Sequence, residues 1–507
     1  MKGTIPALLV LLLLVAPSAV DAQFEYTTNA DNTLTITGFS GDGVTDYSGG
    51  VAVAIPPAIG DLTVTGIGTN AFGQCYEMTN VTIPGTVTTV EDEAFQSCTS
   101  LVSVSIPASV NSIGLQVFAD CSSLTAINVD AQNSSYSSVD GVLFNKGSTI
   151  LVEFPAGVGG SITISNSVTD IGDYAFYDCV NLSSVIVPDS VTRVGNLAFA
   201  GCRALTNIVL GNGVTSIGNY AFGICGVTSV NIPGSVANIG ENAFAGCAGL
   251  TNVIISNGVS NIGSGAFSDS GLISITIPGS VTNIASEAFY GCYSLADVTL
   301  GDGLAYIGVS AFSDCAMTNV TIPGSVTNID NGAFEYCTEL KNATISYGVT
   351  TIGYDAFCET GLTSVTIPSS VTNIGEYAFE TLGLAAVYFG GNAPSDDAND
   401  LFISNPTVYY LPGTSGWAGF ATNTGLVPVL WNPLIQANGA SFGLSNNNFG
   451  FNITGTTNIP IVVEACANLA NPIWTPLQTL NLTNSSYYFS EPFQPNSSGR
   501  FYRISSP

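Results

Sequence analysis

A phenylalanine returns along most of the chain at nearly constant intervals, and this periodicity restricts the fold more than any other feature. The intervals are 22 or 23 residues, apart from one of 58. A unit of this length cannot bury its apolar side chains alone, so neighbouring units must stack and share one core. The repeated residues are Phe72, Phe95, Phe118, Phe176, Phe199, Phe222, Phe244, Phe267, Phe289, Phe312, Phe334, Phe357 and Phe379.

Each unit reads approximately Leu-x-x-Val-x-Ile-Pro-x-x-Val-x-x-Ile-Gly-x-x-Ala-Phe-x-x-Cys. The Val-x-Ile segment is alternating and β-branched, which predicts a short strand, and the Pro that follows ends the strand because it lacks an N–H donor. We therefore expect a mainly β solenoid of about 13 rungs over residues 61–384. Alternate rungs lose one residue near the Cys, as duplication of a two-rung unit would produce. The same duplication explains prolines at a period of 45 residues, namely Pro188, Pro233, Pro278, Pro323 and Pro368.

This unit resembles the BspA-type leucine-rich repeat, a family found in bacterial surface and secreted proteins and in some protist surface proteins. The resemblance covers residues 61–384. It implies a leucine-rich-repeat solenoid that serves adhesion or recognition, usually without catalysis. It supplies no binding residues that can be carried over.

The segments outside the repeat predict further parts. Residues 23–60 alternate as β-hairpin strands do and are interpreted as an N-terminal β cap, because an open solenoid end exposes strand edges. Residues 130–157 predict an inserted hairpin. After the last repeat, residues 385–433 are interpreted as a C-terminal cap, and residues 434–507 carry evenly spaced short strands that predict a small β-sandwich.

The first 22 residues are typical of a secretory signal peptide. Lys2 precedes an apolar run centred on Leu11 to Leu14, and small residues end at Ala22. No later segment is long and apolar enough to span a bilayer, which needs about 18 or more apolar residues. We therefore expect a secreted protein that is extracellular or held at the cell surface, with no transmembrane segment.

The charge balance excludes several classes of function. Lys and Arg number 7, Asp and Glu 36, and His 0, for a net charge of −29. Seven scattered cations cannot form the basic surface that nucleic acids or anionic membranes require. Without His, Ser-His-Asp and Cys-His catalysis and His-ligated metals are excluded.

Ten of the 12 cysteines lie three residues after a repeat Phe, and the eighth rung has Ser270 there. The spacing follows the repeat, so we interpret these cysteines as one stacked column of buried free thiols. Disulfides between neighbouring rungs stay possible on distance alone, since rungs stack at about 4.8 Å. No Cys-x-x-Cys occurs, so no metal site or cofactor is predicted.

Three carboxylate pairs are candidates for a glycosidase or a Ca²⁺ site: Asp92 with Glu93, Asp173 with Asp178, and Asp396 with Asp397. Positions around Ala-Phe are polar in every rung, and a solvated face explains them better. We therefore assign no catalytic, cofactor-binding or metal-binding residues, and we predict that the protein is not an enzyme.

The outward position of the repeat strand, between Val and Ile, is the candidate ligand face. β-propensity and the stacking of like residues explain its composition without a ligand, and an Asn column at residues 238, 261, 283, 328 and 373 is explained by turn stacking. A solenoid strand face is nevertheless a common contact surface. The column reads Ile186, Val209, Asn231, Ile254, Thr276, Thr299, Thr321, Thr344 and Thr366.

These observations predict an exported, non-enzymatic binding or adhesion protein that presents this face to an extracellular protein or glycan. Two alternatives stay open: an enzyme that acts on extracellular polysaccharide through a carboxylate pair, and a structural surface-layer component. If the face is not the contact, the 130–157 hairpin or the 434–507 module is the next candidate.

Overall fold

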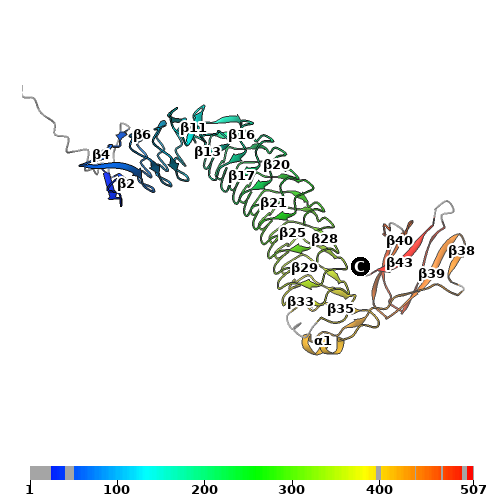
Figure 1. The fold of residues 1–507 in the computed structure, drawn as a ribbon. Coiled ribbons are helices and arrows are strands. Elements are labelled where there is room, and N and C mark those ends of the chain that lie inside the picture. Colours follow the sequence, from blue (N-terminus) through cyan, green and yellow to red (C-terminus); the bar gives the residue numbers. More distant parts are fainter. Residues whose placement is uncertain are drawn as a thin grey trace, which may run out of the picture. The chain divides into compact units, whose positions relative to one another are not determined.

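Figure 1 presents the computed structural model, which describes residues 24–39, 51–394, 401–439, 441–469, 472–493 and 499–505. The predicted signal peptide at residues 1–22 lies outside these ranges. The described chain forms two compact units, one that ends at Leu205 and one that begins at Thr206. The fold is a mainly β solenoid, as predicted, but it has about 16 turns where the repeat predicted about 13 rungs.

In the first unit, most turns give one strand to a face sheet and one shorter strand to a side sheet, in parallel with their neighbours. The face strands are β3 (Val51–Ala54), β6 (Met78–Thr82), β8 (Ser103–Ile106), β10 (Ala126–Val129), β14 (Gly160–Thr163) and β16 (Leu182–Ile186). The side strands are β5 (Leu62–Ile67), β7 (Thr89–Val90), β9 (Ser112–Ile113), β15 (Asp170–Ile171) and β17 (Arg193–Val194). The N-terminal strands β1 (Phe24–Thr28), β2 (Leu34–Phe39) and β4 (Ala58–Ile59) extend the sheet of β5.

Between β10 and β14 lies a three-stranded antiparallel meander. β11 (Tyr136–Val139) pairs with β12 (Val142–Asn145), and β12 pairs with β13 (Ile150–Glu153). Directly after β13, Phe154 stacks on Phe176 with ring centroids 4.8 Å apart. Phe154 therefore occupies the place of a repeat Phe, 22 residues before Phe176 and 36 residues after Phe118.

The second unit continues the same plan. Its first face sheet contains β18 (Asn207–Val209), β20 (Ser229–Ile232), β22 (Asn252–Ile255), β24 (Ser274–Thr276) and β26 (Asp297–Thr299). Its second contains β28 (Asn319–Ile322), β30 (Asn342–Ile345), β32 (Ser364–Ile367), β34 (Ala386–Phe389), β35 (Thr407–Tyr410) and β36 (Val429–Leu430). The side strands are β19 (Ser216–Ile217), β21 (Asn238–Ile239), β23 (Asn261–Ile262), β25 (Asn283–Ile284), β27 (Tyr306–Ile307), β29 (Asn328–Ile329), β31 (Thr351–Ile352) and β33 (Asn373–Ile374).

Pairing along this face alternates between extensive and slight. β20 pairs with β22 over four residues, whereas β22 pairs with β24 only at Asn252 and Ser274. Slight pairing occurs where a strand follows a rung that is one residue shorter. The distance from the repeat Phe to the first apolar residue of the next unit shows this difference. Val227 lies five residues after Phe222 in a shorter rung, while Leu250 lies six residues after Phe244 in a longer one. The one-residue alternation in the sequence therefore coincides with an alternation in the face ladder.

The repeat Phe side chains form the core, as the period predicts. In the second unit, Phe289 stacks between Phe267 and Phe312 at centroid distances of 5.4 and 5.1 Å. Its N–H donates to the carbonyl of Ala311 in the next turn at 2.8 Å. Ring stacking and a forward backbone hydrogen bond thus meet at one residue in each turn.

The end of the second unit departs from the repeat. The helix α1 (Trp417–Thr424), which the sequence analysis did not predict, lies between Gly416 and Gly425, both with positive φ, and buries Trp417 and Phe420. Two small sheets follow: β37 (Leu434–Gln436), β38 (Gly443–Ser445), β39 (Asn448–Thr454) and β42 (Ser486–Pro492) form one, and β40 (Pro460–Cys466), β41 (Thr475–Asn481) and β43 (Phe501–Ser505) form the other. They share one core, as expected for a small sandwich.

Removal of one ring from the Phe column tests its contribution. We expect Phe289→Ala to lower the free energy of unfolding by about 3–5 kcal/mol, because a fully buried ring is replaced by a cavity. Urea denaturation followed by circular dichroism measures this loss. Tyr347→Ala, at a side chain 75% exposed, is the control and should change little. Equal losses in both variants would contradict the column as the source of stability.

Glu153 predicts a pH dependence of stability. Its Oε1 accepts the N–H of Phe118 at 2.8 Å, and burial raises the pKa of this carboxyl to about 8. Because the folded pKa exceeds the unfolded value, folding favours the protonated form, and this contribution is lost as the pH rises from about 4.3 to 8. Glu153→Gln keeps the acceptor and removes the titration. Its melting temperature should rise relative to the parent between pH 5 and 8; a constant difference would contradict the assignment.

Candidate ligand-binding face

The face strands alternate as predicted, with Val and Ile inward and the candidate column outward. In the second unit Thr276 lies beside Thr299, and Thr321 beside Thr344, which lies beside Thr366. All five Thr side chains are exposed, while their inward neighbours are mostly buried. The column therefore faces solvent in register.

The apolar members of the column do not form one continuous patch within the second unit. Val209 and Ile254 are 47% and 54% exposed, but the polar Asn231 on β20 lies between their strands and pairs in register with Ile254. Ile186 is 44% exposed and belongs to the first unit. Each apolar residue is accessible, and in the second unit polar side chains separate them.

Beyond Thr366 the column continues into residues that sequence reasoning did not include. Tyr388 pairs in register with Thr366, and Tyr409 with Tyr388, but both tyrosines are buried. They pack in one core with Phe451 and Phe489 of the C-terminal sheets. The C-terminal sheets therefore cover this end of the face, and the replacement of Thr by Tyr was the available signal.

The cysteine column is a column of free thiols. None of the 12 cysteines forms a disulfide bond, and eleven of them are buried. Most thiols of the column donate to the carbonyl of the Phe one turn earlier, as Cys315 does to Phe289 at 3.2 Å. Burial raises the pKa of Cys247 to about 12 and that of Cys337 to about 12, so both thiols stay protonated at neutral pH. The column is a packing and hydrogen-bonding element.

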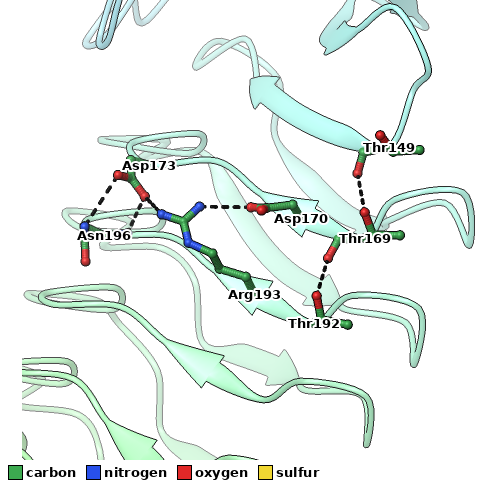
Figure 2. Close-up of polar contacts among 7 residues, drawn as sticks. All are labelled: Thr149, Thr169, Asp170, Asp173, Thr192, Arg193 and Asn196. Atoms are coloured by element: carbon green, nitrogen blue, oxygen red, sulfur yellow. Dashed lines mark hydrogen bonds and ion pairs between the residues drawn. The ribbon is translucent and has the colours of Figure 1, made fainter.

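Two of the three carboxylate pairs have structural partners. Asp92 accepts the N–H of Leu115 at 2.7 Å. Asp173 forms an ion pair with Arg193 and accepts the N–H of Asn196 at 2.9 Å, as Figure 2 shows. The pair Asp396 and Asp397 lies outside the described residues.

The same view shows how polar side chains join turns. Arg193 also contacts Asp170 at 3.0 Å, so one cation bridges two carboxylates (Figure 2). Next to it, the hydroxyl of Thr192 donates to the carbonyl of Thr169, and the hydroxyl of Thr169 to that of Thr149. The Asn column stacks likewise, since Asn283 donates its amide to Asn261. These groups fasten neighbouring turns together.

Backbone conformation explains many acidic residues near the repeat Phe. The second residue after each Phe has a positive φ in most turns, as at Asp269 and Asp314. Gly, Asn and Asp tolerate this conformation better than other residues do. Gly246 and Gly291 occupy the same position with φ of 69° and 67°. The alternation of Gly and Asp there follows from the turn.

One cluster of possible metal ligands is present among the described residues. Ligand atoms of Asp355, Cys358 and Glu380 lie within 4.8 Å of one another. Burial, followed by the nearby carboxylates, raises the pKa of Cys358 to about 12, and a protonated thiol is a poor ligand. The cluster supports no metal assignment.

A hollow lies on the face among the described residues. A cleft of about 530 Å³ lies where β26 and β28 adjoin, and Asp297, Thr299, Asp302 and Thr321 line it. It is the position on the candidate face where two carboxylates meet the Thr column.

Solenoid, Phe column and Cys column together define a leucine-rich-repeat protein. The family model for the BspA type leucine rich repeat region matches in 6 copies, over residues 59–158, 169–292 and 260–384, and the chain belongs to this family. No curated protein matches it.

Several solved structures are similar to the chain, including the following two. A leucine-rich repeat protein from Bacteroides ovatus has 25% identity and a TM-score of 0.46, with 76% of this chain and 98% of that one covered. A leucine rich cell surface protein from Faecalibacterium prausnitzii has 28% identity and a TM-score of 0.41, with 70% and 93% covered.

No helix among the described residues combines the length and the apolar character that a bilayer crossing demands.

The thiol column can be tested by substitution. We expect Cys315→Ser to lower stability by only about 1 kcal/mol, because a hydroxyl can replace the thiol as donor to Phe289. Ser270 already stands in this column, 3.3 Å from Cys292 Sγ. Thiol titration of the denatured, unreduced protein should find 12 free thiols in the parent. Mass-spectrometric detection of disulfides between turns would contradict this assignment.

Proposed function

We propose that this chain is an exported, non-enzymatic binding or adhesion protein whose strand face contacts a protein or glycan outside the cell. Membership of the BspA-type family supports a surface role. The predicted signal peptide at residues 1–22 supports export.

One observation carries the proposal. The Thr column, exemplified by Thr299, Thr321 and Thr344, is exposed in continuous short ladders, while the core is formed by other residues of the same turns. The buried core of these turns therefore does not include the Thr side chains. A regular, uncharged, hydroxyl-bearing surface of this kind suits a contact made over several turns.

The C-terminal end of the outward column also supports a binding role for the strand face. At Tyr388 and Tyr409 the face already accepts a folded β module, the C-terminal sheets of this chain. The indole N–H of Trp431 adds a hydrogen bond to the carbonyl of Pro460 at 2.8 Å. The strand face is thus capable of packing against another β structure when its outward residues are large.

One observation favours the enzyme alternative. Asp297 and Asp302 line the same cleft, and polysaccharide hydrolysis needs two carboxyl groups about 5–9 Å apart. Release of reducing sugar ends from a polysaccharide, abolished by Asp297→Asn, would support that activity instead.

Substitution of charged residues for the Thr side chains of the column tests the binding proposal. We expect the triple variant of Thr299, Thr321 and Thr344 to Glu to lose binding on glycan and protein arrays probed with the mature chain, since three carboxylates alter the contact surface directly. The matched control places three Glu at Asn238, Asn328 and Asn373 on the side sheet and should bind normally. Binding that survives in the Thr variant would move the contact to the 130–157 meander or the 434–507 sheets.

A further inference from the structure

The cleft between β26 and β28 marks a true interruption of the face ladder. β26 is the last strand of one face sheet and β28 the first strand of the next, and no strand pairing joins them. The side strands of the same turns, β27 and β29, pair normally. The two turns therefore keep their ladder on the side sheet and lose it on the face, where β26 and β28 nevertheless remain neighbours.

Comparable junctions in the second unit are closed. Each keeps at least one pair of face residues, namely Asn207 with Ser229, Asn252 with Ser274, and Thr344 with Thr366. A hydroxyl also closes two of these turns, because Ser235 donates to Val214 and Ser280 to Val259, at 2.6 and 2.7 Å. The equivalent hydroxyl of Ser325 is buried without a hydrogen-bond partner. The open ladder and the unsatisfied Ser325 hydroxyl occur in the same turn, although the equivalent hydroxyl of Ser109 also lacks a partner in a turn whose strand β8 is paired.

The opening exposes part of the core. Val298, the inward residue of β26, is partly exposed, whereas the equivalent Val230 and Ile275 are only 4% and 3% exposed. The cleft thus has an apolar floor at Val298 and a polar rim. Its volume of about 530 Å³ falls within the range of about 300–1,000 Å³ found for ligand sites.

The rim is negative, and no ion pair among the described residues involves Asp297 or Asp302. Between Arg203 and Arg500 the chain has a single basic residue, Lys341. Its backbone N–H donates to the carbonyl of Thr318 in the cleft lining, but its side chain is not paired with either carboxylate. An incoming cation would therefore find these carboxylates available. The lining contains no aromatic ring on which a sugar could stack.

We propose that this cleft binds an extended polypeptide segment of a partner through a lysine or arginine side chain. The aliphatic part of that side chain packs on Val298, and its charged end lies between Asp297 and Asp302. This inference rests on the proposed function and names the partner class for the same face.

The test uses two synthetic pentapeptides of alternating threonine and valine, one with a central lysine and one with a central glutamate. Fluorescence anisotropy with the full mature chain should detect the lysine peptide, with at least about a tenfold weaker response for the glutamate peptide. We expect Asp297→Asn to weaken binding of the lysine peptide about tenfold. Both Asn variants, Asp297→Asn and Asp302→Asn, should keep the circular dichroism spectrum of the parent.

Asp269→Asn is the matched control. It removes the same charge from an exposed residue beside the repeat Phe, and Asn tolerates the positive φ at this position. It should leave peptide binding unchanged. Failure of the lysine peptide to bind, or equal losses in the Asp297 and Asp269 variants, would overturn the inference.

A different outcome separates this inference from the proposed function. If a glycan binds, and the triple Thr variant loses that binding while Asp297→Asn retains it, the strand face is a binding surface but the cleft is not a site for basic peptides. If neither glycan nor protein binds the face, both proposals fail.

Discussion

The structure depends on the repeat Phe, because three interactions meet there in many of the turns. The ring stacks on its neighbours, the N–H of Phe267 donates to Ala288 of the next turn, and the carbonyl of Phe267 accepts the thiol of Cys292. A fully buried backbone would otherwise leave polar groups unsatisfied. Each turn therefore needs the next one, and stability arises from contacts between neighbours along the stack.

This constraint explains which parts could be predicted from the sequence. Residues that repeat their environment in every turn, such as Phe289, Cys315 and the outward Thr321, have a position that the period alone determines. The missed helix α1 lies outside the repeat, because it packs Trp417 against Phe389 and Tyr410, and spacing does not encode such contacts. Phe154, by contrast, lies at the regular interval of 22 residues before Phe176, so the period could have revealed it despite the inserted meander.

The sequence predicted which residues point outward on the candidate face, but not how exposed each residue is or where the face carries a cleft. Periodicity places Thr366 and Tyr388 at the same outward position, yet only the packing of the C-terminal sheets determines that Thr366 is exposed and Tyr388 buried. Likewise, the alternating rung length was visible, but not that one junction would lose its face pairing entirely. The cleft is set by small differences in how neighbouring turns approach, and these involve residues far apart in the chain.

The opening between β26 and β28 shows how a stacked fold can vary one surface without losing its core. On the Phe side of the same turns, the rings of Phe289 and Phe312 lie 5.1 Å apart and nearly parallel at 4°. The side ladder between Tyr306 and Asn328 is also intact. The ring column and the side sheet hold the two turns together. Face hydrogen bonds can therefore be absent at one junction, and the loss of stability is confined to that junction. A solenoid of this kind can therefore carry a binding cleft within its regular strand face, in addition to loops at its edges.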